Sequence, residues 1–201
     1  MVASQEGFEP KPIIPQREKR EYPKIELGVP EDYDYFSAER VAGVLSGFGY
    51  GENMMRVHAL YLNKENSQAV GVWRATQEEG HFKDNPVLRG VEQTEAVAQT
   101  LLAALVLANK VPQDKTVRLT SIDLDYRSTA IPPLDLNTIV LLGQSEKEHE
   151  VISYGEVRCG PNILSQGYVS GAVIDTKLGE RLLERTRRQQ ANAITIFSFK
   201  G

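Results

Sequence analysis

The sequence of 201 residues predicts an α+β fold in which one antiparallel sheet curls around a long apolar helix. This helix is expected from about Val91 to Ala108, and from Ala96 onward it is apolar on nearly every side. Such a helix must be surrounded by protein or lipid, and its apolar part is shorter than the roughly 20 residues that a bilayer requires. A hairpin pattern precedes the helix and several strand patterns follow it. The simplest arrangement therefore buries the helix against a sheet, without a membrane.

The N-terminal segment has little tendency to pack, because five prolines interrupt a strongly charged stretch. These are Pro10, Pro12, Pro15, Pro23 and Pro30. Too little apolar surface is available to offset the entropy cost of ordering, which predicts an extended or disordered arm over residues 1–35. A helix is expected to begin after Ser37, a good N-cap, and to end in the glycine-rich stretch 47–51.

The strand patterns lie on both sides of the central helix. Residues 56–74 alternate around turn residues at 63–67, which predicts a β-hairpin. Asn109 and Pro112 mark the end of the helix. Four further strands are then predicted within 117–126, 138–144, 151–159 and 165–174. With a short amphipathic helix over 176–190 and an apolar tail over 194–199, the chain divides into an arm (1–35), a sheet-and-helix domain (36–176) and a C-terminal helix and tail (177–201).

The composition excludes several classes of function. The net charge of −4 gives no support for binding nucleic acid, which would require a clearly basic face. Cys159 is the one cysteine, so neither an internal disulfide nor a thiolate zinc cluster can form. The N-terminus lacks the apolar core of a secretion signal, which predicts a cytoplasmic protein.

Chemistry is expected where a Gly/Asn/Pro loop runs into the central helix. His81 lies in the loop and could transfer a proton near neutral pH. Glu95 lies near the start of the helix among apolar neighbours, so its carboxyl group could hold a proton for donation. The free backbone N–H groups around Gly90 and Val91 could polarise a carbonyl oxygen. An acid, a base and an oxyanion site suit removal of a proton next to a carbonyl with loss of a hydroxyl, and they equally suit other carbonyl reactions.

The same stretch contains the pattern G-H-F-x-x-x-P-x-x-x-G-V followed by E-A-x-A-Q. The matching residues are Gly80, His81, Phe82, Pro86, Gly90, Val91, Glu95, Ala96, Ala98 and Gln99. This pattern resembles the 3-hydroxyacyl-acyl-carrier-protein dehydratases, a family with the hotdog fold, and the resemblance extends over about residues 52–175. It implies a hotdog fold, in which an antiparallel sheet wraps around the central helix.

The resemblance also implies an activity, dehydration of 3-hydroxyacyl thioesters to trans-2-enoyl thioesters or the reverse hydration, as in fatty acid biosynthesis. His81 would abstract the α-proton, Glu95 would help expel the hydroxyl group as water, and the Gly90 and Val91 amides would hold the thioester carbonyl. The other residues that the pattern places around the substrate are Phe82, Pro86 and Gln99. The substrate would be carried by acyl-carrier protein or coenzyme A, and no metal or organic cofactor would be needed. In the family the histidine and the carboxylate meet between subunits, which implies a homodimer that could assemble further.

The sequence departs from the family pattern within the loop itself. Lys83 and Asp84 stand where the family has Pro-Gly, Arg89 replaces a proline, and Tyr126 replaces a phenylalanine in the strand that follows the helix. Loss of proline would loosen the loop geometry. Two alternative functions therefore stay open at this point: a hotdog acyl-thioesterase that activates water through a carboxylate, and a non-catalytic hotdog protein that binds acyl groups or supports assembly.

Overall fold

The computed structural model describes residues 20–65, 67–76, 87–112, 114–143, 149–182, 184, 185 and 188. The strands are β1 (Tyr33–Phe36), β2 (Ala59–Asn63), β3 (Gln68–Ala75), β4 (Lys115–Tyr126), β5 (Leu134–Leu141), β6 (Glu150–Cys159) and β7 (Asn162–Asp175). The α-helices are α1 (Ala38–Ser46) and α2 (Gly90–Leu107), and two short 3₁₀ helices are η1 (Pro30–Asp32) and η2 (Glu52–Met54). A further helix begins at Thr176 and is described through Leu182, while the predicted tail 194–199 lies outside the described residues.

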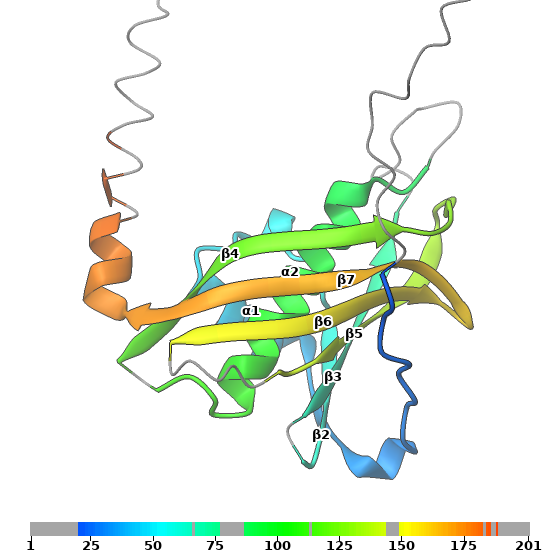
Figure 1. Cartoon of the computed structure of the whole chain (residues 1–201), viewed down its shortest axis with the longest axis horizontal. Coiled ribbons are helices and arrows are strands. Elements are labelled where there is room, and N and C mark those ends of the chain that lie inside the picture. Colours follow the sequence, from blue (N-terminus) through cyan, green and yellow to red (C-terminus); the bar gives the residue numbers. More distant parts are fainter. Residues whose placement is uncertain are drawn as a thin grey trace, which may run out of the picture.

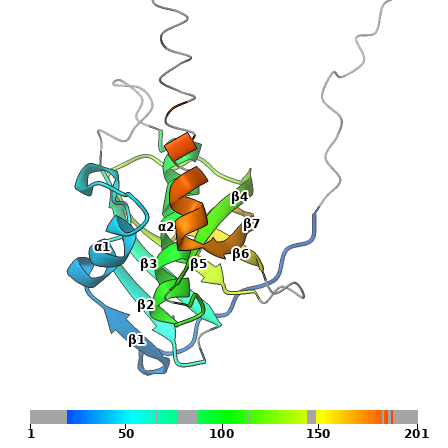
Figure 2. The same cartoon turned by 90° about the vertical axis from the view of Figure 1, so that its left-hand side faces the viewer.

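All seven strands form one antiparallel sheet in the order β1-β2-β3-β5-β6-β7-β4. Figure 1 shows the long strands of this sheet in front of α2, and Figure 2 shows α2 lying along one face of the sheet with α1 beside it. The predicted α+β architecture is therefore confirmed. The predicted helix at 91–108 differs from the observed α2 by one residue at each end.

The central helix packs directly on the sheet over its whole middle section. Ala96 to Leu105 are buried, and two strand glycines let the helix come close. A Cβ atom at Gly71 of β3 would lie 2.3 Å from Thr100 Oγ1, and one at Gly155 of β6 would lie 2.6 Å from Val97 Cγ1. Val97 and Thr100 of α2 therefore face the sheet. Gln99 faces the chain that precedes β2, where it contacts the backbone of Arg56 and Val57.

The segment that precedes β1 runs across the outer face of the sheet, opposite to α2 (Figure 1). Ile25 packs there against Ile139 and Tyr154. Arg20 forms an ion pair of 2.6 Å with Asp123, and the Tyr22 hydroxyl donates to Asp125 over 2.5 Å. These contacts involve the described part of the predicted arm; the division of the chain at residues 35 and 176 stays a prediction.

The helices also bear on the question of a membrane. None of those within the described ranges combines the length and the hydropathy needed to cross a bilayer.

Candidate functional site

The first turn of α2 presents free backbone donors. Arg89 is the N-cap residue and makes no side-chain capping hydrogen bond. The N–H groups of Gly90, Val91 and Glu92 have no acceptor within the helix, and no described residue supplies one. Val91 is 61% exposed. Because the helix dipole adds partial positive charge at this end, the turn is suited to bind a carbonyl oxygen on which negative charge develops.

Glu95 lies one turn further along α2 and is partly buried. Gln99 Nε2 donates to Glu95 Oε1 over 3.3 Å. Tyr50, from the loop after α1, also forms a hydrogen bond with the Glu95 carboxylate. Burial raises the pKa of Tyr50, and its hydrogen bond and charge interaction with Glu95 raise it further, so its hydroxyl group stays protonated as a donor at neutral pH. Two donors from different parts of the chain thus hold this carboxylate.

Gln99 lies behind Glu95 and is completely buried. Its Oε1 accepts from the backbone N–H groups of Arg56 (2.7 Å) and Val57 (3.3 Å), and its Nε2 donates to Met54 O (2.7 Å) as well as to Glu95. These bonds use both donors and both acceptor positions of the amide. The sequence pattern places Gln99 among the substrate-binding residues, but in this chain its side chain has no group left for a substrate. We propose instead that it acts by holding residues 54–57 and Glu95.

Glu92 is buried in the first turn of α2 and is held by two arginines. Arg56 Nε lies 2.6 Å from Glu92 Oε2, and Arg89 forms a second ion pair with the same carboxylate. The departure from the family pattern at Arg89 therefore has a local role, because this side chain helps to neutralise a buried charge that would otherwise be costly.

Tyr126, the last residue of β4, touches the start of α2. Its hydroxyl oxygen lies 3.1 Å from Gly90 O and 2.9 Å from Thr94 Oγ1, and its side chain is 54% exposed. A Cβ atom at Gly90 would lie 2.6 Å from the Tyr126 ring. The structure thus shows that Tyr126 contacts the first turn of α2 at Gly90. The sequence analysis named Tyr126 only as a replacement of phenylalanine and predicted no contact for it.

The remaining predicted site residues cannot be placed in this geometry. His81, Phe82 and Pro86 lie outside the described residues. Of the predicted set, the structure brings Gly90, Val91, Glu95 and Gln99 together on one helix. Sequence reasoning missed Tyr50 and Tyr126, because both reach α2 from segments that are far away in the chain and neither belongs to a regular spacing.

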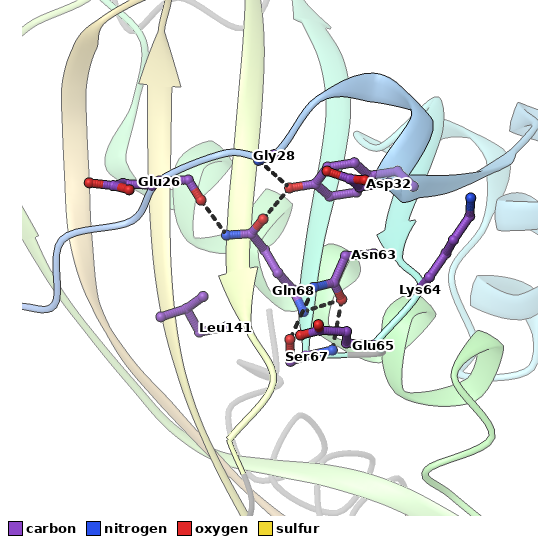
Figure 3. A pocket seen from close by; sticks show the side chains of 10 residues that line it. Glu26, Gly28, Asp32, Asn63, Lys64, Glu65, Ser67, Gln68 and Leu141 are labelled. Atoms are coloured by element: carbon purple, nitrogen blue, oxygen red, sulfur yellow. Dashed lines mark hydrogen bonds between the residues drawn. The ribbon is translucent and has the colours of Figure 1, made fainter.

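The described residues also line a polar cavity of about 460 Å3 on the other side of the molecule, between the segment before β1 and the β2–β3 turn (Figure 3). Its polar side chains largely satisfy one another. The Tyr33 hydroxyl bonds to Gln68 Oε1, Gln68 Nε2 donates to Glu26 O over 3.2 Å, and Asn63 Oδ1 accepts from the Ser67 and Gln68 amides. This network anchors the N-terminal segment, and we assign no ligand to the cavity.

Comparison with known proteins gives matches in structure only. No protein-family model and no curated protein sequence matches this chain. Among solved structures, a hypothetical protein from Thermus thermophilus, TTHA0967, described as a thioesterase superfamily member, is 11% identical with a TM-score of 0.54, over 62% of this chain and 93% of that one. The fluoroacetyl-CoA thioesterase FlK is 11% identical with a TM-score of 0.51, over 59% and 93%. A point mutant of FlK in complex with acetyl-CoA is 14% identical with a TM-score of 0.50, over 66% and 99%.

These matches confirm the predicted hotdog fold. They contradict the prediction of a dehydratase, because the named enzymes among them are thioesterases, which are hydrolases and not lyases. The error has a physical origin. In both reactions free helix amides can stabilise negative charge on a carbonyl oxygen, and a histidine and a carboxylate can transfer the protons, so the pattern alone does not separate elimination of a hydroxyl group from attack by water.

Proposed function

We propose that this protein is an acyl-thioesterase that hydrolyses acyl-coenzyme A substrates. One observation carries the proposal: Glu95 follows Val91 by four residues, so both lie on the same face of α2. Side chains in a helix lean toward its N-terminus, which directs the Glu95 carboxylate back toward the free amides of the first turn. The rise of 1.5 Å per residue separates the two positions by about 6 Å along the axis. The base and the oxyanion donors are therefore close enough along the helix to act on one thioester group.

In the proposed reaction, the Glu95 carboxylate accepts a proton from water as the water oxygen attacks the thioester carbon. The carbonyl oxygen becomes an oxyanion and is stabilised by the Gly90 and Val91 N–H groups. Collapse of this intermediate breaks the C–S bond and releases the thiolate of coenzyme A, which takes up the proton held by Glu95. The products are a carboxylic acid, which then ionises, and the free thiol. We propose that His81, which precedes α2 in the sequence, contacts the same substrate.

The choice of carrier is supported by the structural neighbours. FlK is a thioesterase of fluoroacetyl-CoA, and one of its mutants is in complex with acetyl-CoA. We therefore propose coenzyme A as the carrier, and leave acyl-carrier protein and the homodimer as predictions from the sequence. β4 is an edge strand of the described sheet, and the backbone of an edge strand can pair with a second copy of the chain. This edge is therefore the first surface to test for a dimer.

The test measures release of free thiol from acetyl-, butyryl-, octanoyl- and palmitoyl-coenzyme A with a thiol-reactive dye. Replacing Glu95 with Gln is expected to lower kcat by about 10²–10⁴-fold, the usual effect of removing a general base. The control is Glu39→Gln, because Glu39 is an exposed carboxylate on α1. The proposal fails if the wild-type protein releases no thiol from any of these substrates, or if the Glu95→Gln protein is as active as wild type.

A further inference from the structure

The Tyr126 hydroxyl group belongs to a directed chain of hydrogen bonds. It donates its one proton to Gly90 O over 3.1 Å. Its oxygen must then act as the acceptor in the contact of 2.9 Å with Thr94, whose hydroxyl supplies the proton. Thr94 follows Gly90 by four residues, so both ends of the chain lie on one face of α2. Tyr126 thus ties the end of β4 to the first turn of the helix.

The contact with Gly90 is too close for any other residue type to replace glycine without rearrangement. A Cβ atom there would lie 2.6 Å from Tyr126 Cζ, 2.8 Å from its hydroxyl oxygen and 2.9 Å from Cε1. The aromatic ring therefore rests directly on the Gly90 backbone.

This contact stabilises a turn that lacks the usual N-terminal cap. Arg89, the N-cap residue, makes no side-chain hydrogen bond to the turn, and uncapped helix ends fray. The carbonyl of Gly90 and the N–H of Val91 belong to the same planar peptide group and point in opposite directions. A hydrogen bond that fixes the Gly90 oxygen therefore also fixes the direction of the Val91 N–H.

A buried polar group without a partner among the described residues lies beside Tyr126. Ser165 of β7 is its register partner and is completely buried, and Ser165 Oγ has no hydrogen-bond partner in the described part of the chain. Ser165 faces α2, because it pairs with Val157, two residues from Gly155, which contacts Val97. Gln93 Oε1, on α2 itself, is likewise buried and without a partner among the described residues. Ser153 Oγ on β6 is a third buried group without a partner among the described residues, and of the three only Ser165 is paired with Tyr126.

We propose that Tyr126 is a positioning residue of the active site, which holds the Gly90–Val91 peptide group so that the Val91 N–H is aimed at the oxyanion. The inference rests on the proposed thioesterase function. Tyr126 acts through the backbone and does not itself transfer a proton. The hydroxyl group is the one part of the Tyr126 side chain that can form this hydrogen bond.

The test is Tyr126→Phe, which keeps the ring and removes the hydroxyl group. Loss of a complete oxyanion donor costs about 10²–10³-fold in kcat. A donor that is only less well oriented should cost less, about 10-fold in kcat, with KM within about twofold of wild type because ground-state binding is retained. Thr94→Val removes the donor to Tyr126 and should have a smaller effect. The double variant should be no slower than Tyr126→Phe, because both changes act through one hydrogen-bond chain.

The matched control is Tyr35→Phe, since Tyr35 is 59% exposed on β1 at the other edge of the sheet. A second readout does not depend on activity: the Val91 amide resonance should shift in Tyr126→Phe and stay in place in Tyr35→Phe. The proposal is overturned if kcat is unchanged, if KM rises while kcat is kept, or if the Val91 resonance does not move. If the wild-type protein is inactive but the Val91 resonance shifts in Tyr126→Phe, the proposed thioesterase function is wrong and the contact between Tyr126 and the first turn still holds. The two failures are therefore distinguishable.

Discussion

Replacing Gln99 with Met should destabilise the fold by a predictable amount. Methionine has nearly the same volume, so the change leaves little cavity. It removes the acceptor of two backbone N–H groups, that of Val57, which is buried, and that of Arg56, which is partly exposed. A buried donor without an acceptor costs about 1–3 kcal/mol. Because water can reach Arg56 in part, the expected loss is about 2–4 kcal/mol in the free energy of unfolding.

Urea denaturation measures this loss. A protein of this size should unfold with an m-value of about 2–3 kcal/mol/M, so the midpoint should fall by roughly 1 M. The control is Arg118→Met, because Arg118 is exposed on β4 and its replacement should change stability by less than about 0.5 kcal/mol. A Gln99→Met midpoint that matches the control would refute the inference that this amide holds residues 54–57. The variant also loses a donor to Glu95, so it should lose both stability and rate, whereas Glu95→Gln should lose rate alone.

Two other predictions concern the outer face of the sheet. Ile25→Ala should cost about 2–4 kcal/mol in thermal or urea unfolding, because Ile25 is only 8% exposed and fills a site on the sheet; a cost below about 0.5 kcal/mol would mean that the N-terminal segment contributes no packing. Burial raises the pKa of Tyr154 above its usual value of 10.0, and the hydrogen bond and charge interaction with the Glu156 carboxylate raise it further. The unfolded state then releases this proton at lower pH than the folded state, so stability should be constant below about pH 10 and fall as the pH rises further. Tyr154→Phe should flatten that fall in a pH series of unfolding midpoints, and an equal slope in both proteins would contradict this.

The sequence predicted the architecture well because periodicity reports burial directly. The run from Leu101 to Ala108 contains no polar residue, and only a helix enclosed by other elements is compatible with that. The alternation in residues 117–126 similarly identified β4, since one face of this strand meets α2. Strand order could not be obtained in this way, because pairing β3 with β5 depends on contacts between segments that are separated by the whole of α2.

The site was harder to predict, for two different reasons. The candidate residues on α2 could be proposed because helical spacing relates Glu95 to Val91 within one element, and their role stays a prediction. Tyr50 reaches Glu95 from the glycine-rich loop after α1, which local patterns identify only as a helix exit, and the Tyr126 contact with Gly90 depends on how the sheet curves. The reaction type was predicted wrongly because the same donors and bases serve several reactions of a thioester carbonyl.

One polar stripe of α2 serves both the fold and the proposed reaction. Glu92, Glu95 and Gln99 are spaced by three and four residues, so they lie on one helical face, toward the chain that precedes β2. The outer two are buried and fully engaged: Glu92 binds two arginines, and Gln99 binds the backbone of residues 54–57. Glu95 lies between them and is only partly buried. Glu92 and Gln99 therefore stabilise the wall of the site, while the Glu95 carboxylate stays accessible to a substrate. For this reason Gln99→Met is expected to lower the free energy of unfolding as well as the rate, whereas Glu95→Gln, one turn away, is expected to lower the rate alone.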